Sequence, residues 1–314
     1  METSQAQQPE TQQQFQQVIN KRSPFRVALL KLSRNKLAIA CLIILIAIIT
    51  IVILAPQISK HSPEEANVRQ SMRPGIWALL DKNSPDAAAY VPGHYFGTDY
   101  LGRDIFSRLL YGGRISLTVG FFSTLMGLLV GVILGLLAGY YRRLDNPIMR
   151  VMDILFTFPS ILLAILIVAM LGVSTINTML AISIWSIPNF ARMTRGQVLQ
   201  IKEQDYILAI RSIGAGGARI IFGHILKNCL PIIIVIATMR MATSIISIAT
   251  LSYLGLGVPP PTPEWGGLIA MGRQYMWDRP SQIILPGMMV TITVICFNIL
   301  GDKLRDILDP SLKD

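Results

Sequence analysis

The stretch ISLTVGFFSTLMGLLVGVILGLLAG (Ile115–Gly139) decides the fold of this chain, because it contains no charged residue. An α-helix needs about 20 predominantly apolar residues to cross the hydrocarbon core of a bilayer. Within the stretch, Gly127, Gly131, Gly135 and Gly139 recur at every fourth position, and so they share one face of the expected helix. Such a face predicts close packing against a neighbouring helix; the alternative is a surface that slides during a transport cycle.

Further apolar blocks predict a chain that crosses the membrane several times. They are Leu37–Ala55, Ile154–Val173, Asn177–Phe190, Cys229–Gly257 and Ile283–Gly301. Segments rich in Arg and Lys stand in the N-terminal tail, around 142–150, across 192–227 and after 301, and such segments favour the cytoplasmic side. If all four are cytoplasmic, residues 154–190 form a helical hairpin. We therefore expect an all-α integral membrane protein with six transmembrane helices and both termini in the cytoplasm.

The composition excludes an ordinary soluble enzyme. Of the 314 residues, 52% are hydrophobic and 15% are charged, and the mean hydropathy is +0.51; globular proteins average about 25% charged residues. The net charge of +10 is interpreted as a signal of membrane topology, and no nucleic-acid partner is expected. The histidines lie far apart and the cysteines lie in or beside apolar blocks, so no metal site is expected.

A short helix is predicted in the basic segment between the fourth and fifth spans. Asp205 can cap its N-terminus and Gly214 can end it. Ile207, Ile210 and Ile213 follow a three-residue spacing. An exposed, partly apolar helix of this kind suits a partner surface, and the alternative is a helix that lies on the membrane interface.

Arg240 lies near the middle of the fifth apolar block. A charge at that depth costs about 2.5–3.5 kcal/mol on insertion scales, and such residues usually face a wet cavity or a charged partner. Arg240 is therefore a candidate substrate-pathway residue that attracts a carboxylate. The alternative is a structural ion pair with an acid, for example on a companion subunit.

The approach to the second span has its own pattern. Gly97 and Gly102 permit tight turns, and Asp104 can cap a helix that begins at Ile105. Arg108 and Arg114 stand just outside the span, where we expect their charged ends to reach the membrane surface.

Residues 206–228, YILAIRSIGAGGARIIFGHILKN, resemble the coupling-helix motif of binding-protein-dependent ABC permeases. Ala209, Gly214 and Leu226 match the motif. Leu208 stands where the family has an acid, Ile210 where it has an alanine and Lys227 where it has a proline. The resemblance implies a set of residues that couple the chain to an ATPase subunit, namely Asp205, Tyr206, Ala209, Ile210 and Gly214.

The chain from about residue 26 onward is similar to the oligopeptide/dipeptide permeases of the OppC/DppC type. The matching segments are Gly97–Asp104 (GTDYLGRD) with Ser107-Arg108, Tyr111–Leu117, Met152-Asp153 with Phe158-Pro159, Leu251–Gly257, Glu264–Gly266, and Gly301-Asp302 through Asp309-Pro310. The family often has an acid where this chain has Ile248, so the charge along the pathway differs from that of its relatives.

The resemblance implies the type I ABC importer permease fold. Residues 1–36 would be a disordered, basic cytoplasmic tail, 37–113 the first span and an extracytoplasmic loop, 114–305 the permease domain, and 306–314 a cytoplasmic tail. The chain would be half of a heterodimeric channel in a bacterial cell membrane. Its implied partners are an OppB/DppB-like permease, two ATPase subunits of the OppD/OppF or DppD/DppF type, an extracytoplasmic solute-binding protein, a peptide substrate and the surrounding lipid.

The chain itself is not expected to be an enzyme. It contains no G-x-x-x-x-G-K-[ST] phosphate-binding loop, and the pair Gly-Lys does not occur. We therefore expect no cofactor on this chain, and ATP and Mg²⁺ would be used by the partner ATPase subunits. Alternatives to peptide import are an importer of the same build for nickel, glutathione or another small solute, and a self-sufficient secondary carrier.

Overall fold

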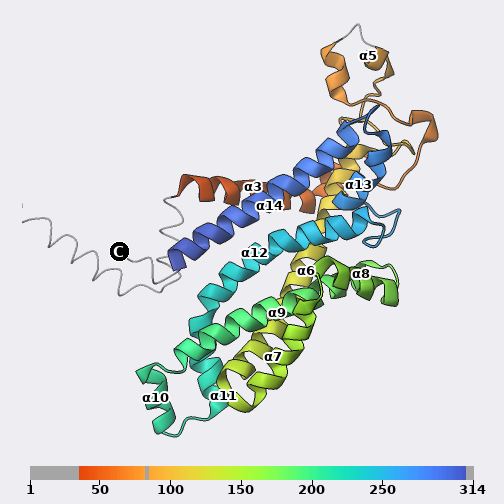
Figure 1. The fold of residues 1–314 in the computed structure, drawn as a ribbon. Helices are drawn as coiled ribbons and strands as arrows, with labels where there is room; N and C mark the ends of the chain where they lie inside the picture. The colour runs from red at the N-terminus through yellow and green to blue at the C-terminus, as the bar shows by residue number, and fades with distance from the viewer. Residues whose placement is uncertain (1–34, 82–84, 309–314) are drawn as a thin grey trace, which may run out of the picture.

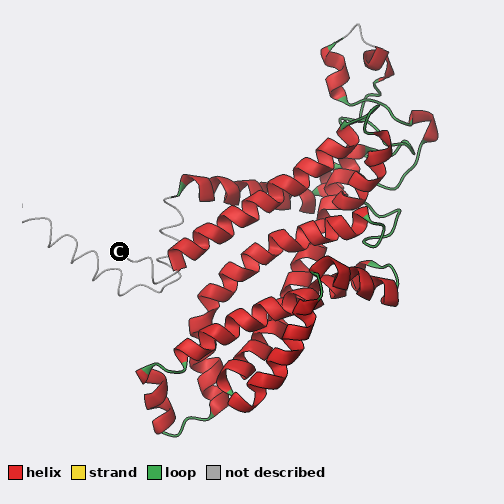
Figure 2. Cartoon of the chain, viewed as in Figure 1, coloured by secondary structure: helices red, strands yellow, loops and turns green. Residues whose placement is uncertain are grey.

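The computed structural model describes residues 35–81 and 85–308, and within these ranges the chain is built of helices and loops with no strand (Figures 1 and 2). The all-α prediction is confirmed. Most of the two predicted tails, 1–36 and 306–314, lies outside the described residues.

Helices are named as in Figure 1. The long ones are α3 (Lys36–Ile53), α6 (Ile105–Tyr140), α7 (Arg142–Thr157), α8 (Ser160–Leu171), α9 (Thr175–Ile201), α12 (Leu226–Tyr253) and α14 (Ser281–Leu308). The short ones are α4 (Ala55–Ile58), α5 (Pro85–Ala89), α10 (Asp205–Ser212), α11 (Gly217–Ile220), α13 (Trp265–Gly272), the 3-10 turns η1 (Val68–Gln70), η2 (Ile76–Leu80) and η4 (Arg273–Tyr275), and the π-helical turn η3 (Ile221–Ile225).

Four of the described helices are long and apolar enough to cross a membrane: α3, α6, α14, and the continuous helical segment Gly217–Tyr253 that contains α12. The bent pair formed by α7 and α8 counts as a fifth if the two helices together make one span. The more polar α9 packs along α6. Figure 1 places α10 and α11 at one end of the long helices and α5 and α13 at the other. The count of six spans and the cytoplasmic position of both termini stay predictions.

The apolar block Ile154–Val173, predicted as part of a helical hairpin, is not one continuous helix. The chain breaks between α7 and α8, whose axes differ in direction by 92°. Phe158 and Pro159 both adopt extended backbone angles. The cause is local, because a proline ring disfavours helical geometry in the residue before it and proline has no N–H to donate.

Two ion pairs fasten α7 to α9. Arg195 donates from Nη2 to Asp145 Oδ2 at 2.6 Å and from Nε to the other carboxylate oxygen. Arg192 donates to Asp153 at 2.6 Å. The helix that begins with the basic segment therefore also carries the two acids that hold it to α9.

The glycine stripe of α6 faces α9. A Cβ atom built on Gly131 would lie 2.6 Å from Phe190 Cβ, and one built on Gly139 would lie 2.6 Å from Val198 Cβ. Gly127 and Gly135 approach the same helix as closely. The two backbones can pack together at this distance only because all four positions lack a side chain.

The approach to α6 is ordered by Asp104, which caps the helix through a bond from Ser107 N to its Oδ2 at 2.7 Å. Gly97 and Gly102 have φ of +76° and +75°. Arg108 does not reach the membrane surface, because α6 begins at Ile105 and the preceding loop folds over its first turns. Its buried side chain donates to Pro63 O at 2.8 Å and lies 3.6 Å from Asp99 Oδ2.

The loop before α14 is also tied to α6. Glu264 caps α13 through Gly267 N at 3.0 Å and accepts a hydrogen bond from Ser116 Oγ at 2.7 Å. The indole of Trp265 donates to Leu109 O at 3.0 Å. The proline-rich segment 258–264 forms no helix, and α13 begins directly after it.

We predict that Gly131→Ala destabilises the protein by about 1–3 kcal/mol, because the added methyl group overlaps α9. Thermal unfolding of the purified protein measures the change. Gly287→Ala is the matched control, since Gly287 lies in α14 and an added Cβ there would meet no atom within 4 Å. Its effect should be neutral or slightly stabilising. Equal melting temperatures for the two variants would contradict the tight seam.

Candidate functional site

The candidate coupling helix, α10, begins one position differently from the prediction. Gln204 occupies the cap position with extended backbone angles and no side-chain hydrogen bond, and Asp205 is the first helical residue. Asp205 is therefore not the N-cap. Its carboxylate still lies in the first turn, where the helix dipole favours a negative charge.

The end of α10 is set by Gly214, whose φ is +84°. Its N–H donates to Arg211 O at 3.0 Å, and the N–H of Ala215 donates to Ile210 O at 3.3 Å. This pair of bonds is the Schellman arrangement, which requires a left-handed residue after the helix. The helix therefore stops at the position that the sequence indicated.

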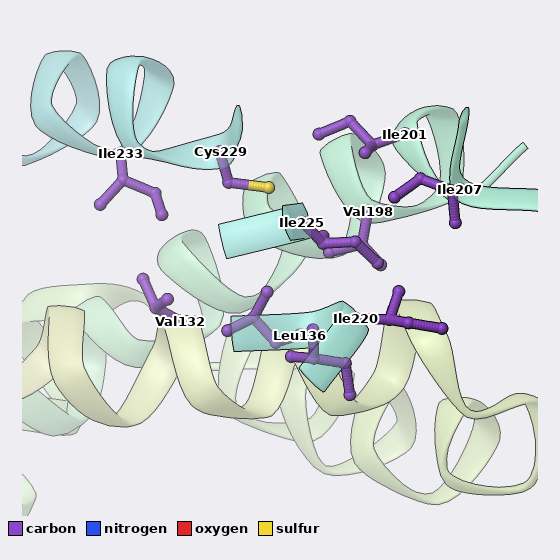
Figure 3. Close-up of a cluster of buried hydrophobic side chains, with 10 residues drawn as sticks. Val132, Leu136, Val198, Ile201, Ile207, Ile220, Ile225, Cys229 and Ile233 are labelled. Atoms are coloured by element: carbon purple, nitrogen blue, oxygen red, sulfur yellow. The ribbon is translucent and has the colours of Figure 1, made fainter. Parts of the chain in front are cut away.

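Ile207 attaches α10 to the rest of the protein. Its side chain is 2% exposed and belongs to an apolar cluster that we call the base cluster. The members are Val132 and Leu136 of α6, Val198 and Ile201 of α9, Ile207 of α10, Ile220 of α11, Ile221 and Ile225 of η3, and Cys229 and Ile233 of α12. Figure 3 shows these side chains converging from several helices. Ile207 therefore joins α10 to a cluster that also contains side chains of three long helices, α6, α9 and α12.

A hydrogen bond adds a second connection between α10 and α12. Asn228 Nδ2 donates to the hydroxyl oxygen of Tyr206 at 3.0 Å. Desolvation raises the pKa of the Tyr206 phenol, so the ring stays neutral at physiological pH. Asn228 lies at the start of α12, where the sequence alone did not single it out.

The opposite face of α10 is open. Leu208 is 47% exposed, Ile213 is 84% exposed and Ala209 is also exposed. Ile210 is half-buried and packs against the base cluster. Of the five predicted coupling residues, four are thus exposed, namely Asp205, Tyr206, Ala209 and Gly214, and Ile210 is half-buried.

Arg240 lies half-buried in α12, with its guanidinium carbon 5.6 Å from the ring centre of Trp185 in α9. None of the ion pairs among the described residues includes Arg240. Its observed contact is a cation–π arrangement. The structure therefore supplies an aromatic neighbour and no acid from the described part of this chain.

Trp185 was not predicted as a site residue. It stands in the block Asn177–Phe190, which is otherwise free of aromatic side chains until Phe190. A large aromatic amid small polar residues was the signal available in the sequence.

Among the described residues, no group of three or more His, Cys, Asp or Glu side chains could hold a metal ion.

Comparison with known proteins gives two family matches. Residues 127–314 match a family described as the binding-protein-dependent transport system inner membrane component, and residues 23–79 match the N-terminal TM domain of oligopeptide transport permease C. The chain is 44% identical to the dipeptide transport system permease protein DppC of Alkalihalophilus pseudofirmus, over 93% of this chain and 91% of that protein.

Another relative is the glutathione transport system permease protein GsiD of Pectobacterium atrosepticum, at 51% identity over 70% of this chain and 73% of that protein. Among solved structures, an inward-facing conformation of the MetNI methionine ABC transporter matches with a TM-score of 0.54. The match has 21% sequence identity and covers 65% of this chain and 97% of the other. The predicted type I ABC importer permease fold is confirmed.

We predict that Gly214→Val strongly reduces transport by the assembled importer without preventing membrane insertion, because a β-branched residue is strained at φ +84°. Gly214→Asn is the matched control, since asparagine tolerates the left-handed region. Uptake normalised to the amount of inserted protein measures the effect. Wild-type uptake by the Val variant would show that the shape of the α10 terminus is unimportant.

Proposed function

The chain belongs to the family of binding-protein-dependent transport system inner membrane components, and from this premise we propose that it moves di- or oligopeptides across the inner membrane. As a member of that family it is a multi-pass inner membrane permease subunit of an ABC importer, and the ATPase is a separate subunit. The family assignment removes the self-sufficient secondary carrier from consideration.

The observation that carries the peptide assignment is the match to dipeptide permeases along most of the chain. A match that extends through the first span and its loop favours the oligopeptide subfamily over ABC permeases in general. Glutathione, itself a small peptide with free carboxylates, is the second candidate, because the GsiD relatives are also close.

In the proposed mechanism, the exposed face of α10 docks on an ATPase subunit. ATP binding draws the two ATPases together, and the base cluster passes the displacement of α10 to α6, α9 and α12. Packed helices move as rigid bodies rather than deforming continuously. The cavity of this permease and its companion would thus open alternately to the two sides, with substrate delivered by the binding protein.

Six spans with cytoplasmic termini fit this proposal. The bent pair α7–α8 would form the third span and the polar α9 the fourth, which places α10 on the cytoplasmic side. The α9 helix is less apolar than a lipid-exposed span, and this suits a helix that packs along α6 on one side and faces a pathway on the other.

Uptake by cells that lack the chain tests the substrate class. We expect deletion to abolish uptake of labelled dipeptides and re-expression to restore it. Loss of glutathione uptake with normal dipeptide uptake would favour the second candidate. Normal uptake of both, with loss of Ni²⁺ accumulation, would contradict the peptide proposal.

We predict that Arg240→Leu lowers transport of peptides with a free carboxylate by about tenfold or more, since a hydrogen bond to a charged group contributes roughly 1.5–3 kcal/mol. Amidated peptides, compared at concentrations that saturate the binding protein, should be affected less. Arg240→Lys keeps the charge and is the control. Its transport of peptides with a free carboxylate should lie between that of the wild type and that of Arg240→Leu. Equal losses for free and amidated peptides would exclude Arg240 as a carboxylate contact.

A further inference from the structure

A cavity of about 200 Å³ lies between α8, α9 and α12. Its walls combine apolar and hydroxyl side chains, among them Ser160, Ile182, Trp185, Ile246, Ser247 and Thr250. Ile246 is 45% exposed, so the cavity lies next to an accessible surface of α12. The break at Phe158-Pro159 positions it, because α8 begins only after the chain has turned.

Arg240 is connected to this cavity through Trp185. The indole forms part of the cavity wall and also lies against the guanidinium. Arg240, Thr243, Ser247 and Thr250 follow helical spacing, so they form one polar stripe along α12. Polar groups in a span usually face the interior or a water-filled pathway.

The hydroxyl groups of the stripe bond to the backbone of their own helix. Thr243 Oγ1 donates to Arg240 O at 2.9 Å, and Ser247 Oγ donates to Thr243 O at 2.8 Å. They therefore leave lone pairs for a ligand without exposing unsatisfied donors. The guanidinium of Arg240 forms no ion pair among the described residues and provides the only full positive charge on the stripe.

The volume decides what fits. A cavity of about 150 Å³ holds one benzene ring, whereas pockets for whole drug-sized ligands measure about 300–1,000 Å³. A space of about 200 Å³ therefore accepts one apolar or aromatic side chain and excludes a complete peptide.

We propose that this cavity is a side-chain subsite of the translocation pathway, in which the C-terminal residue of a peptide inserts while its carboxylate lies on Arg240. This inference rests on the proposed peptide transport and deepens it. Trp185 lies between the carboxylate contact and the side-chain cavity, since its indole lies beside the guanidinium of Arg240 and forms part of the cavity wall. The subsite predicts a preference for peptides that end in a medium-sized apolar residue.

The test compares dipeptides that differ only in the C-terminal residue, Ala-Gly, Ala-Leu and Ala-Trp, each at a concentration that saturates the binding protein. Transport is measured in vesicles that contain the full importer. Ser247→Leu narrows the cavity and should reduce transport of Ala-Leu relative to Ala-Gly by about tenfold, the discrimination that an apolar pocket achieves for small differences in size. Ile246→Ala widens it and should raise transport of Ala-Trp relative to Ala-Leu.

Thr238→Leu is the matched control, because Thr238 is a half-buried position of α12 that does not line this cavity. The transport ratios of this variant should equal those of the wild type. If the Ser247→Leu importer does not assemble, the transport of Ala-Trp relative to Ala-Leu by the Ile246→Ala importer tests the subsite alone. If the variants change the transport of all three dipeptides by the same factor, the cavity is not a side-chain subsite. A cavity that holds a lipid chain would give this result. Failure of the wild-type importer to move any peptide would instead refute the proposed function.

Discussion

The burial of Ile207 among side chains of α6, α9, α11, η3 and α12 is the contact on which the proposed coupling depends. Full burial of an isoleucine contributes about 1.5–3 kcal/mol. Of the other α10 side chains, the half-buried Ile210 also packs against the base cluster, and the rest of the helix is largely exposed. The Tyr206–Asn228 hydrogen bond acts in the same direction and ends on α12. A short helix held by Ile207, Ile210 and one hydrogen bond could transmit force to the spans while its outer face stays free for a partner.

Helices α6, α9 and α12, which share the base cluster, also contact one another farther along their length. At the α6–α9 seam four positions of α6 lack a side chain, so the two helices pack closely, and the ion pairs of Asp145 and Asp153 join α7 to α9. Arg240 and Trp185 lie where α12 faces α9. In the proposed cycle, a displacement that starts at α10 would reach Arg240 and Trp185 through packed helices. In this proposal Arg240, whose charge is costly in the span, and α10, whose outer face is exposed, move together.

Much of this arrangement could be predicted from the sequence, and the misses have identifiable causes. The length of the apolar blocks indicated the spans, and the four-residue spacing of the glycines indicated the packing face of α6. That spacing cannot show that the helix packed on this face is α9. Hydropathy averages over Phe158-Pro159 and so hides a bend that the proline rule alone would have placed there. Asp205 failed as a cap because Gln204 takes the extended conformation first. Arg108 was misplaced because its burial depends on a loop far away in the sequence, and Trp185 gained meaning only from its contact with Arg240.

In the proposed cycle this chain is a gate that a separate ATPase moves through α10. The most direct test reconstitutes the permease pair and the binding protein in vesicles, with and without the ATPase subunits, and follows a labelled dipeptide against its gradient. We expect accumulation only when the ATPases and ATP are both present, and loss of that accumulation with Ile207→Ser. Uphill accumulation by the permeases alone would contradict the gate.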